Sequence, residues 1–318
     1  MIGIYGAGAF GTGLAISYAR AGHTVRLFAR DASHLAEMEK TRQNARYLPD
    51  MDFPDAIELC ENASDLDTAN LILMATPAQS LRMVLAGFQT SAPLVLCAKG
   101  LENSTRLLQS EIAEEFVGIE DIAVLTGPSF AIDLAAGHPT ALSLAAHPSR
   151  LEDLQKRLST SHLRIYANQD IKGVQIGGAL KNIYAIACGL VEGSGLGDSA
   201  KAALMTRSFA ELSRFAVTQG AQTESLFGLS VFGDLVLTCS SPKSRNFAYG
   251  IEAAKRGPFT PNKTVEGLVS TQVLAEWAAA EGFDMPICTA LARFLAGDAN
   301  LQEIQKQLLA RPLSSETT

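Results

Sequence analysis

Residues 6–11, GAGAFG, constrain the fold more than any other part of the sequence. They follow the apolar run Met1–Tyr5 and open a segment with the residue spacing of a helix. In this strand–turn–helix context Gly6 permits a tight turn, Gly8 lets the backbone approach a pyrophosphate, and Gly11 allows close helix–strand packing. The N-terminus of the helix then offers free N–H groups and a positive dipole end to an anion. The segment therefore predicts a dinucleotide-binding turn at the start of the chain.

Short apolar runs alternate with helical patterns through the first half of the chain. The expected strands are Met1–Tyr5, Thr24–Ala29, Asn70–Ala75, Leu94–Ala98, Ile122–Leu125 and Thr140–Ala145, with a further strand at Leu163–Ala167. The expected helices are Thr12–Ala21, Ser33–Lys40, Ala78–Ala86, Arg106–Phe116 and Ser129–Ala136. The strand runs are mostly continuous, which is typical of strands covered on both faces. The alternation predicts an α/β fold with a Rossmann-like, doubly wound, mainly parallel sheet.

The pattern changes after about Asp170, where helical segments follow one another with few strand signals. The expected helices are Ile171–Val191, Lys201–Gln219, Ser230–Cys239, Arg245–Lys255, Val265–Ala280, Thr289–Leu295 and Leu301–Leu309. We expect a dinucleotide-binding (Rossmann) domain at 1–170 and an all-α substrate and catalytic domain at 171–318, which fits a chain of 318 residues. The polar tail from Arg311 to Thr318 is expected to be frayed.

Composition argues against several other classes of protein. The chain has 26 Lys and Arg against 33 Asp and Glu, a net charge of −7, whereas nonspecific nucleic-acid binding needs a basic face. The five cysteines show no CxxC pair and the five histidines no HExxH pattern, so we expect no metal. We see no signal peptide and no apolar run of the roughly 18–20 residues that span a bilayer. The chain is therefore expected to be soluble and cytoplasmic, with no membrane insertion.

Arg30 lies at the end of the second expected strand, about 20 positions beyond the glycine motif, where the residue facing the adenosine ribose is expected. An acidic residue there favours NAD, whereas an arginine offers charge-assisted hydrogen bonds to the 2′-phosphate of NADP. We therefore favour NADP(H). NAD(H) remains the alternative, in which Arg30 is solvated and Asp31 contacts the ribose.

Three later segments differ from ordinary core sequence. Lys99 and the segment Gly127–Ala131 each follow an expected strand, at the edge where doubly wound sheets bind ligands. Gly177 and Gly178 lie within an apolar helix at a cost of about 1 kcal/mol each relative to alanine, which suggests close approach by a backbone or a ligand. Lys181 follows them as a cation in a long neutral stretch.

Together these segments resemble bacterial-type NAD(P)-dependent glycerol-3-phosphate dehydrogenases over essentially the whole chain. The matching segments are Gly6–Gly11, Lys99-Gly100, Gly127–Ala131, Gly178–Asn182, Phe232–Cys239, Ser244–Asn246 and Val265–Gly267. The resemblance implies a Rossmann domain, a helical domain and an active site in the cleft between them. It also implies interconversion of dihydroxyacetone phosphate and sn-glycerol 3-phosphate, which supplies glycerol 3-phosphate for phospholipid synthesis.

The resemblance further implies a role for individual residues. Lys181 matches the family's general acid and base and Asp234 its partner carboxylate, and the two influences on the lysine pKa oppose each other, since burial lowers it and the anion raises it. The implied substrate contacts are Lys99, Gly127, Ser129, Lys181, Asn182, Asp234, Thr238, Ser244, Arg245 and Asn246. With the loop glycines Gly6, Gly8 and Gly11, the implied cofactor contacts are Ala9, Phe10, Arg30, Lys99, Ala131, Arg245, Thr264 and Glu266. Thr264 departs from the family, where many relatives have an aliphatic residue.

Ser244-Arg245-Asn246 begins a helical stretch and combines a potential N-cap with a guanidinium and an amide, which suits the substrate phosphate. Two alternatives remain. One is another two-domain dehydrogenase that resembles ketopantoate reductase or the hydroxyacid dehydrogenases. The other is a non-catalytic nucleotide sensor. Members of the family often form homodimers, so a homodimer is a further expectation.

Overall fold

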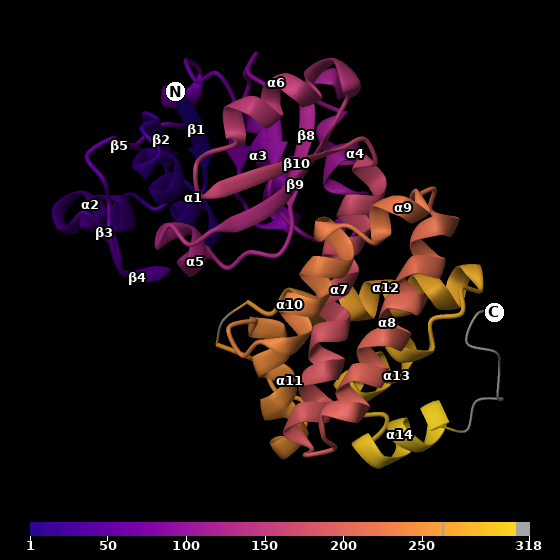
Figure 1. The fold of residues 1–318 in the computed structure, drawn as a ribbon. Helices are drawn as coiled ribbons and strands as arrows, with labels where there is room; N and C mark the ends of the chain where they lie inside the picture. The colour runs from indigo at the N-terminus through magenta and orange to yellow at the C-terminus, as the bar shows by residue number, and fades with distance from the viewer. Residues whose placement is uncertain (263, 310–318) are drawn as a thin grey trace. The chain divides into compact units, whose positions relative to one another are not determined.

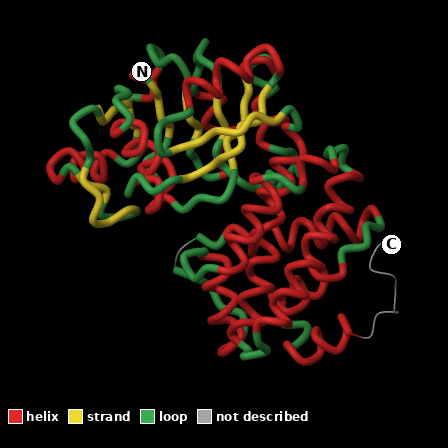
Figure 2. The backbone as a smooth tube through the Cα atoms, viewed as in Figure 1, coloured by secondary structure: helices red, strands yellow, loops and turns green. Residues whose placement is uncertain are grey.

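The computed structural model describes residues 1–262 and 264–309; the expected polar tail from Arg311 lies outside the described residues. The chain divides into two compact units. The first contains Met1–Gly178 with Ala221–Asp234, and the second contains Ala179–Gly220 with the chain from Leu235 onward (Figure 1). The strands lie in the first unit and the second is built from helices (Figure 2). The expected functional division after residue 170 stays a prediction.

One sheet of eight strands forms the centre of the first unit, in the order β10-β9-β8-β7-β6-β1-β2-β5. Its strands are β1 Ile2–Tyr5, β2 Val25–Phe28, β5 Ile57–Cys60, β6 Ile72–Met74, β7 Leu94–Leu96, β8 Ile122–Thr126, β9 Thr140–Ala146 and β10 Leu163–Asn168. Neighbouring strands are parallel except for β8 and β9, which are antiparallel. A separate antiparallel pair consists of β3 Gln43–Asn44 and β4 Leu48–Asp52. The expected mainly parallel, Rossmann-like sheet is confirmed.

Helices cover both faces of this sheet, as alternate residues of its strands show. Leu73 of β6 belongs to a core cluster that contains buried residues of α1 (Ala9–Arg20), α2 (Ala32–Thr41), α5 (Ala131–Ala135) and α6 (Pro148–Leu158). Its neighbours Ile72 and Met74 belong to a second core cluster, which contains buried residues of η1 (Ala63–Leu66), α3 (Leu81–Gly87) and α4 (Gln109–Ala113). Four short elements complete the unit: η2 Ala78–Ser80, η3 Ile119–Asp121, α9 Thr223–Leu226 and the π-helical turn η4 Leu229–Gly233. The sheet is therefore doubly wound.

Helices α7 and α11 of the second unit are in backbone contact. The helices of this part of the chain are α7 Ile171–Gly193, which begins in the first unit, α8 Asp198–Thr218, α10 Asp234–Ser240, α11 Arg245–Arg256, α12 Glu266–Glu281, α13 Pro286–Ala296 and α14 Leu301–Leu309. A Cβ atom on Gly189 would lie 2.2 Å from the Phe247 carbonyl oxygen, and one on Gly250 would lie 2.2 Å from the Ile186 carbonyl oxygen. Only glycines at the crossing allow this approach. The expected helical C-terminal domain is confirmed.

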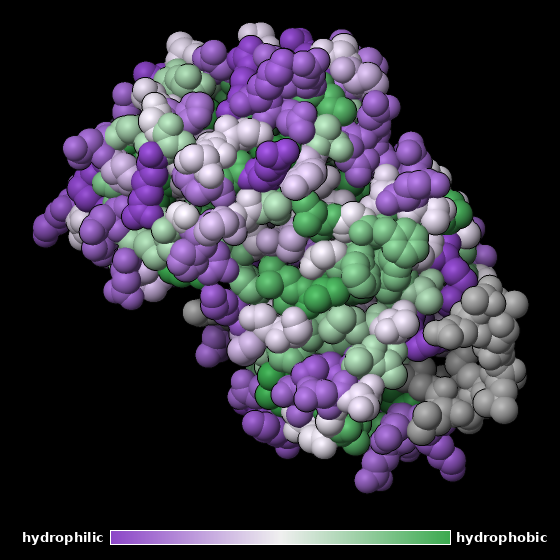
Figure 3. All heavy atoms as spheres, viewed as in Figure 1, coloured by the Kyte–Doolittle hydropathy of each residue, from purple (hydrophilic) through white to green (hydrophobic). Residues whose placement is uncertain are grey.

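The expectation that no apolar segment is long enough to cross a membrane is wrong for α7. This helix has 23 residues and passes by length and composition, and the bent pair Thr223–Ser240 with Arg245–Arg256 passes when taken as one span. However, 94% of the most apolar window of α7 is buried inside the protein, as in the core helix of a globular domain. Hydrophobic side chains are also visible at the surface over the helical part of the chain (Figure 3).

Several elements differ from the sequence-based expectation. The strands β3, β4 and β5 and the helix α6 were not expected. The expected helix Arg106–Phe116 is confined to Gln109–Ala113, because Arg106 has a φ of +64° and cannot be helical. The expected helix Ser230–Cys239 is divided into the π-helical turn η4 and the α-helix α10.

Candidate active site

The glycine loop between β1 and α1 has the geometry of an anion-binding turn. Gly6 has a φ of +115°, which side chains rarely adopt, and a Cβ on Gly11 would lie 2.0 Å from the Gly6 carbonyl oxygen. Gly8 is the N-cap of α1, and nothing lies within 4 Å of the position of its missing Cβ. Open space thus borders the N-terminus of a twelve-residue helix. This arrangement fits a dinucleotide pyrophosphate.

Asn44 holds this loop from outside the motif and was missed in the sequence. It is completely buried, and its Nδ2 donates to the Ala7 carbonyl at 2.9 Å and to the Thr12 hydroxyl at 2.8 Å. Its Oδ1 lies 2.9 Å from Nε2 of His34 on α2 and accepts from the Tyr47 N–H. These partners lie up to 37 positions away, so no local pattern could have revealed them.

Arg30 and Asp31 follow β2 and differ in how their side chains are used. Arg30 is exposed. Asp31 is the N-cap of α2, and its carboxylate accepts from the N–H groups of Ser33 and His34 and from the Ser33 hydroxyl. These hydrogen bonds, above all that from Ser33, lower the pKa of Asp31 to about 2. The Asp31 carboxylate therefore serves the helix terminus.

The other expected cofactor contacts of this unit lie near the loop. Ala9 and Phe10 form the first turn of α1 and are partly buried. Ala131 begins α5, and its carbonyl oxygen would lie 2.7 Å from a Cβ on Gly13 of α1. The start of α5 is therefore packed directly on the helix that follows the glycine loop.

Lys99 lies where the sheet edge was expected to bind ligands and is paired with Asp234. Its Nζ is 2.7 Å from Asp234 Oδ2 and also donates to the Gly127 carbonyl at 3.4 Å. The Asp234 side chain is 2% exposed and that of Lys99 17%. Gly127 has a φ of +141°, and nearby Ser129 is partly buried. Lys99, Gly127 and Asp234 thus form one cluster, and the expected support of Lys181 by Asp234 stays a prediction.

The structure gives a different reason for each of the two adjacent glycines of α7, Gly177 and Gly178. A Cβ on Gly177 would lie 2.4 Å from a methyl carbon of Val231, so a side chain fills this space. A Cβ on Gly178 would be in ordinary contact with Lys99 and Thr126, at 3.5 and 3.6 Å. Gly178 therefore faces the Lys99 cluster.

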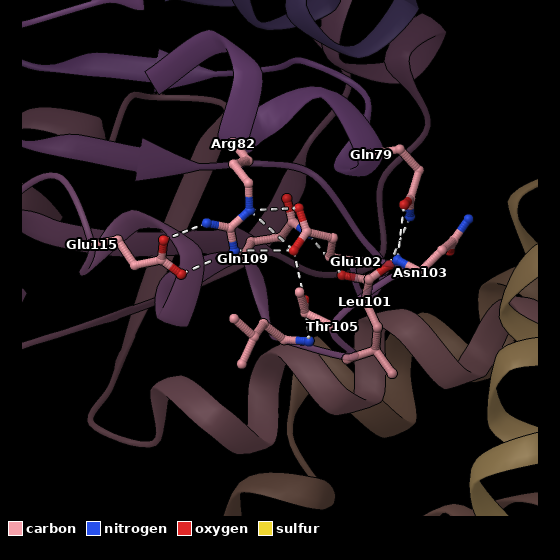
Figure 4. A network of polar contacts seen from close by, with 10 residues as sticks. Gln79, Arg82, Leu101, Glu102, Asn103, Thr105, Gln109 and Glu115 are labelled. Carbon is pink, nitrogen blue, oxygen red and sulfur yellow. Dashed lines mark hydrogen bonds and ion pairs between the residues drawn. The ribbon is translucent and has the colours of Figure 1, made fainter. Parts of the chain in front are cut away.

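A polar network anchors the loop that carries Lys99 (Figure 4). The side chain of Gln79 donates to the Leu101 carbonyl at 2.7 Å and accepts from the Asn103 N–H at 3.0 Å. Arg82 binds the buried carboxylate of Glu102 at 2.9 Å and the exposed carboxylate of Glu115. The Arg82 guanidinium and the Thr105 hydroxyl lower the pKa of Glu102. The loop after β7 is thereby tied to the loop and helix that follow β6.

Lys181 lies within the second unit and is 6% exposed. Its Nζ donates to the hydroxyl of Thr238 on α10 at 2.9 Å, and Thr238 is itself 5% exposed. The burial that the sequence suggested for this lysine is thus present, and its ammonium has a hydroxyl partner. A buried amine held in this way suits proton transfer.

Asn182 connects the N-termini of α11 and α12. It accepts from Asn246 Nδ2 at 2.9 Å and donates to Glu266 Oε2 at 3.2 Å. Asn246 in turn accepts from the Gly267 N–H at 2.9 Å. Both asparagines are buried, and the close crossing of α7 and α11 allows them to meet.

The residues expected to bind the substrate phosphate lie at the start of α11. Ser244 is the N-cap and accepts from the Phe247 N–H at 3.3 Å. The Arg245 side chain is 55% exposed, and its NH2 lies 4.0 Å from Oε1 of Glu266. Thr264 is exposed just before α12. The expected residues of this unit, from Lys181 to Glu266, therefore gather around the starts of α11 and α12 and the Lys181–Thr238 pair.

The described residues contain no group of three or more His, Cys, Asp or Glu side chains that could hold a metal ion.

Comparisons with known proteins identify the family of this chain. The family model for the N-terminus of NAD-dependent glycerol-3-phosphate dehydrogenase matches residues 1–152, and the model for its C-terminus matches residues 170–306. Glycerol-3-phosphate dehydrogenase [NAD(P)+] from Methylobacterium radiotolerans is 46% identical over 99% of this chain and 98% of its own length. The corresponding protein from Chelativorans sp. is also 46% identical, over 99% and 98%.

Solved structures give the same result. A glycerol-3-phosphate dehydrogenase from Coxiella burnetii is 34% identical with a TM-score of 0.91, covering 98% of each chain. A 2-dehydropantoate 2-reductase from Geobacter metallireducens is 14% identical with a TM-score of 0.58, over 94% of this chain and 99% of that one, and shares the fold alone. The reductase alternative is thus not favoured. The chain belongs to the NAD-dependent glycerol-3-phosphate dehydrogenase family.

Proposed function

We propose that the protein interconverts dihydroxyacetone phosphate and sn-glycerol 3-phosphate with NAD(P)H. The observation that carries the proposal is the buried Lys181 ammonium, held by Thr238 at 2.9 Å in a chain of this family. A bound nicotinamide supplies or accepts the hydride. Lys181 donates a proton to the carbonyl oxygen as negative charge develops, and accepts it in the reverse direction. Thr238 orients the amine.

The substrate phosphate is assigned to the start of α11. Arg245 is exposed and charged, Ser244 caps the helix, and the N-terminal N–H groups of α11 favour an anion. Lys99, Gly127, Ser129 and Asp234 are proposed as further contacts from the sheet edge. Asp234 remains the proposed carboxylate that supports Lys181. Its ion pair with Lys99 indicates that it is ionised, as this role requires.

We propose NADP(H) as the preferred cofactor, with NAD(H) as the alternative. The exposed side chain of Arg30 is available for a 2′-phosphate. The carboxylate of Asp31, which would bind the ribose of NAD, is already used as the cap of α2. The loop from Gly6 to Gly11 would hold the pyrophosphate, and Arg245 and Glu266 are proposed cofactor contacts.

We also propose a cytoplasmic location and a homodimer. Burial of α7 inside the protein supports its role as a core helix. The exposed hydrophobic side chains Leu196, Val217 and Val269 of the second unit are compatible with a subunit interface. Light scattering of the purified chain tests the homodimer, which a monomeric mass would contradict.

The decisive test of the activity follows nicotinamide absorbance with dihydroxyacetone phosphate and NADPH, repeated with NADH and with ketopantoate. We expect turnover of the phosphorylated ketone and none of ketopantoate. Turnover of ketopantoate alone would favour the reductase alternative. Nucleotide binding without any turnover would favour the sensor.

A further inference from the structure

The turn between β3 and β4 places a second arginine next to Asp31, the residue that follows Arg30. Arg46 lies in this turn, and its NH1 is 3.1 Å from Asp31 Oδ2. Its guanidinium lies 5.2 Å from the centre of the Tyr47 ring. The side chain of Arg46 is nevertheless 54% exposed, so much of it is accessible to a ligand. An ion pair at this exposure adds little to stability, which leaves another role open for the arginine.

The position of Arg46 is fixed relative to the glycine loop. Asn44, two residues earlier, is completely buried and binds the Ala7 carbonyl inside that loop. The turn is closed by the Tyr47 N–H, which donates to both the backbone carbonyl and the side chain of Asn44. One buried amide therefore holds the turn of Arg46 and the expected pyrophosphate site together.

The charges around Arg30 show why a second arginine matters. The ionised Asp31 carboxylate would repel a 2′-phosphate and cancels one positive charge. Arg30 and Asp31 alone sum to zero, whereas Arg30, Arg46 and Asp31 sum to +1. Phosphate recognition needs such a positive balance and benefits from several N–H donors.

We propose that Arg46 is a specificity-determining residue that binds the 2′-phosphate of NADP(H) together with Arg30. This inference rests on the proposed preference for NADP(H). In it, Asp31 orients the Arg46 guanidinium from one side, and the free N–H groups of Arg46 bind the phosphate from the other.

The test measures binding of adenosine 2′,5′-bisphosphate and of 5′-AMP, which lacks only the 2′-phosphate, to the full chain by calorimetry. Arg46→Gln should weaken the 2′,5′-bisphosphate by roughly tenfold, which is typical of losing a hydrogen bond to a charged group, and 5′-AMP by less than about twofold. Arg150→Gln is the matched control. Arg150 is a similarly exposed arginine of the same unit, paired with Asp121 at 2.8 Å, and its loss should change neither affinity.

The asparagine variant of Asp31 separates direct binding from charge compensation, because asparagine also caps helices. In the Asp31→Asn background, Arg46→Gln should still weaken the 2′,5′-bisphosphate; loss of the effect there would overturn direct binding. If Arg46→Gln keeps the preference for the ligand with a 2′-phosphate and Arg30→Gln loses it, the proposed role of Arg46 is wrong and that of Arg30 stands. If the unsubstituted chain binds both ligands equally, the proposed NADP(H) preference itself is wrong.

Discussion

The glycine loop of the first unit is built from backbone groups, whereas the polar cluster around Lys181 in the second unit is built from side chains. This Lys181 cluster consists of Lys181, Asn182, Thr238, Asn246 and Glu266. The loop offers backbone N–H groups at the start of α1, and its key feature is the open space beside Gly8. The Lys181 cluster uses side chains from several helices, including Asn182 and Glu266, which are 84 positions apart. The loop should therefore be sensitive to added atoms, and the cluster to removed polar groups.

The largest effect should come from removing the Lys181 amine. We expect Lys181→Ala to lower kcat by about 10²–10⁴-fold, the usual contribution of a general acid or base, while nucleotide affinity stays nearly unchanged. Lys201→Ala is the control, since Lys201 in the same unit forms surface ion pairs with Glu192 and Asp198. Steady-state kinetics and nucleotide titration measure both. A Lys181→Ala enzyme with the original kcat would remove Lys181 from the mechanism.

Two alanine substitutions test the glycine loop, because each adds a single carbon atom to it. Gly11→Ala places its Cβ 2.0 Å from the Gly6 carbonyl oxygen, so we expect a loss of about 2–4 kcal/mol in the free energy of unfolding. Gly8→Ala meets nothing within 4 Å, so stability should change by less than about 1 kcal/mol. Its methyl group instead fills the proposed pyrophosphate space and should weaken nucleotide binding.

Urea unfolding and calorimetry compare the two glycine variants. Equal stability losses in both would show that the structure assigns the space around the loop wrongly. Unchanged nucleotide affinity in Gly8→Ala would move the pyrophosphate elsewhere.

A buried carboxylate in the second unit should make stability depend on pH. Glu211 accepts from the N–H groups of Ile287 and Cys288, and burial raises its pKa to about 7. The folded state then holds a proton that the unfolded state releases above its lower pKa. The stabilisation is fully present below about pH 4.5 and is lost as pH rises through about 7, with a slope of at most about 1.4 kcal/mol per pH unit.

Urea unfolding between about pH 5 and pH 8 measures this dependence, and Glu211→Gln should flatten it. The same slope in both proteins would assign the titration to another group. In the first unit Asp31, whose pKa is lowered to about 2, should contribute in the opposite sense, since its stabilisation is present above the unfolded pKa and is lost as pH falls towards about 2.

The smallest effect should come from the network that anchors the Lys99 loop. Glu102→Gln removes the buried carboxylate that binds Arg82 and Thr105, and we expect the KM for the phosphorylated ketone to rise about fivefold. Glu115→Gln removes only the exposed partner of Arg82 and should change KM by less than about twofold. Equal KM values in both variants would show that the network does not position Lys99.

The sequence predicted the central strands and the glycine loop well. Apolar runs mark the central strands because those strands are buried on both faces, and spaced glycines mark the loop because the tight turn that needs them lies within six consecutive residues. The edge strand Ile57–Cys60 was missed because it is short and partly exposed. The helix Pro148–Leu158 was missed because only three of its residues are buried.

Side-chain partners could not be predicted in the same way. Lys99 was singled out by its place after an expected strand and Asp234 through the resemblance, but their ion pair joins residues 135 positions apart. Asn44 carries no local signal, since a buried asparagine beside a turn looks in the sequence like any exposed one. Such pairings depend on which elements the tertiary structure brings together.

The contact between Gly189 and Gly250 has a consequence for engineering the enzyme. Neither residue has a functional group, yet one methyl group at either position would act as a wedge between two helix axes. The wedge would separate Asn182 from Asn246 without altering any polar atom. Attempts to reshape the substrate site will therefore depend on two positions that a search for reactive side chains would never select.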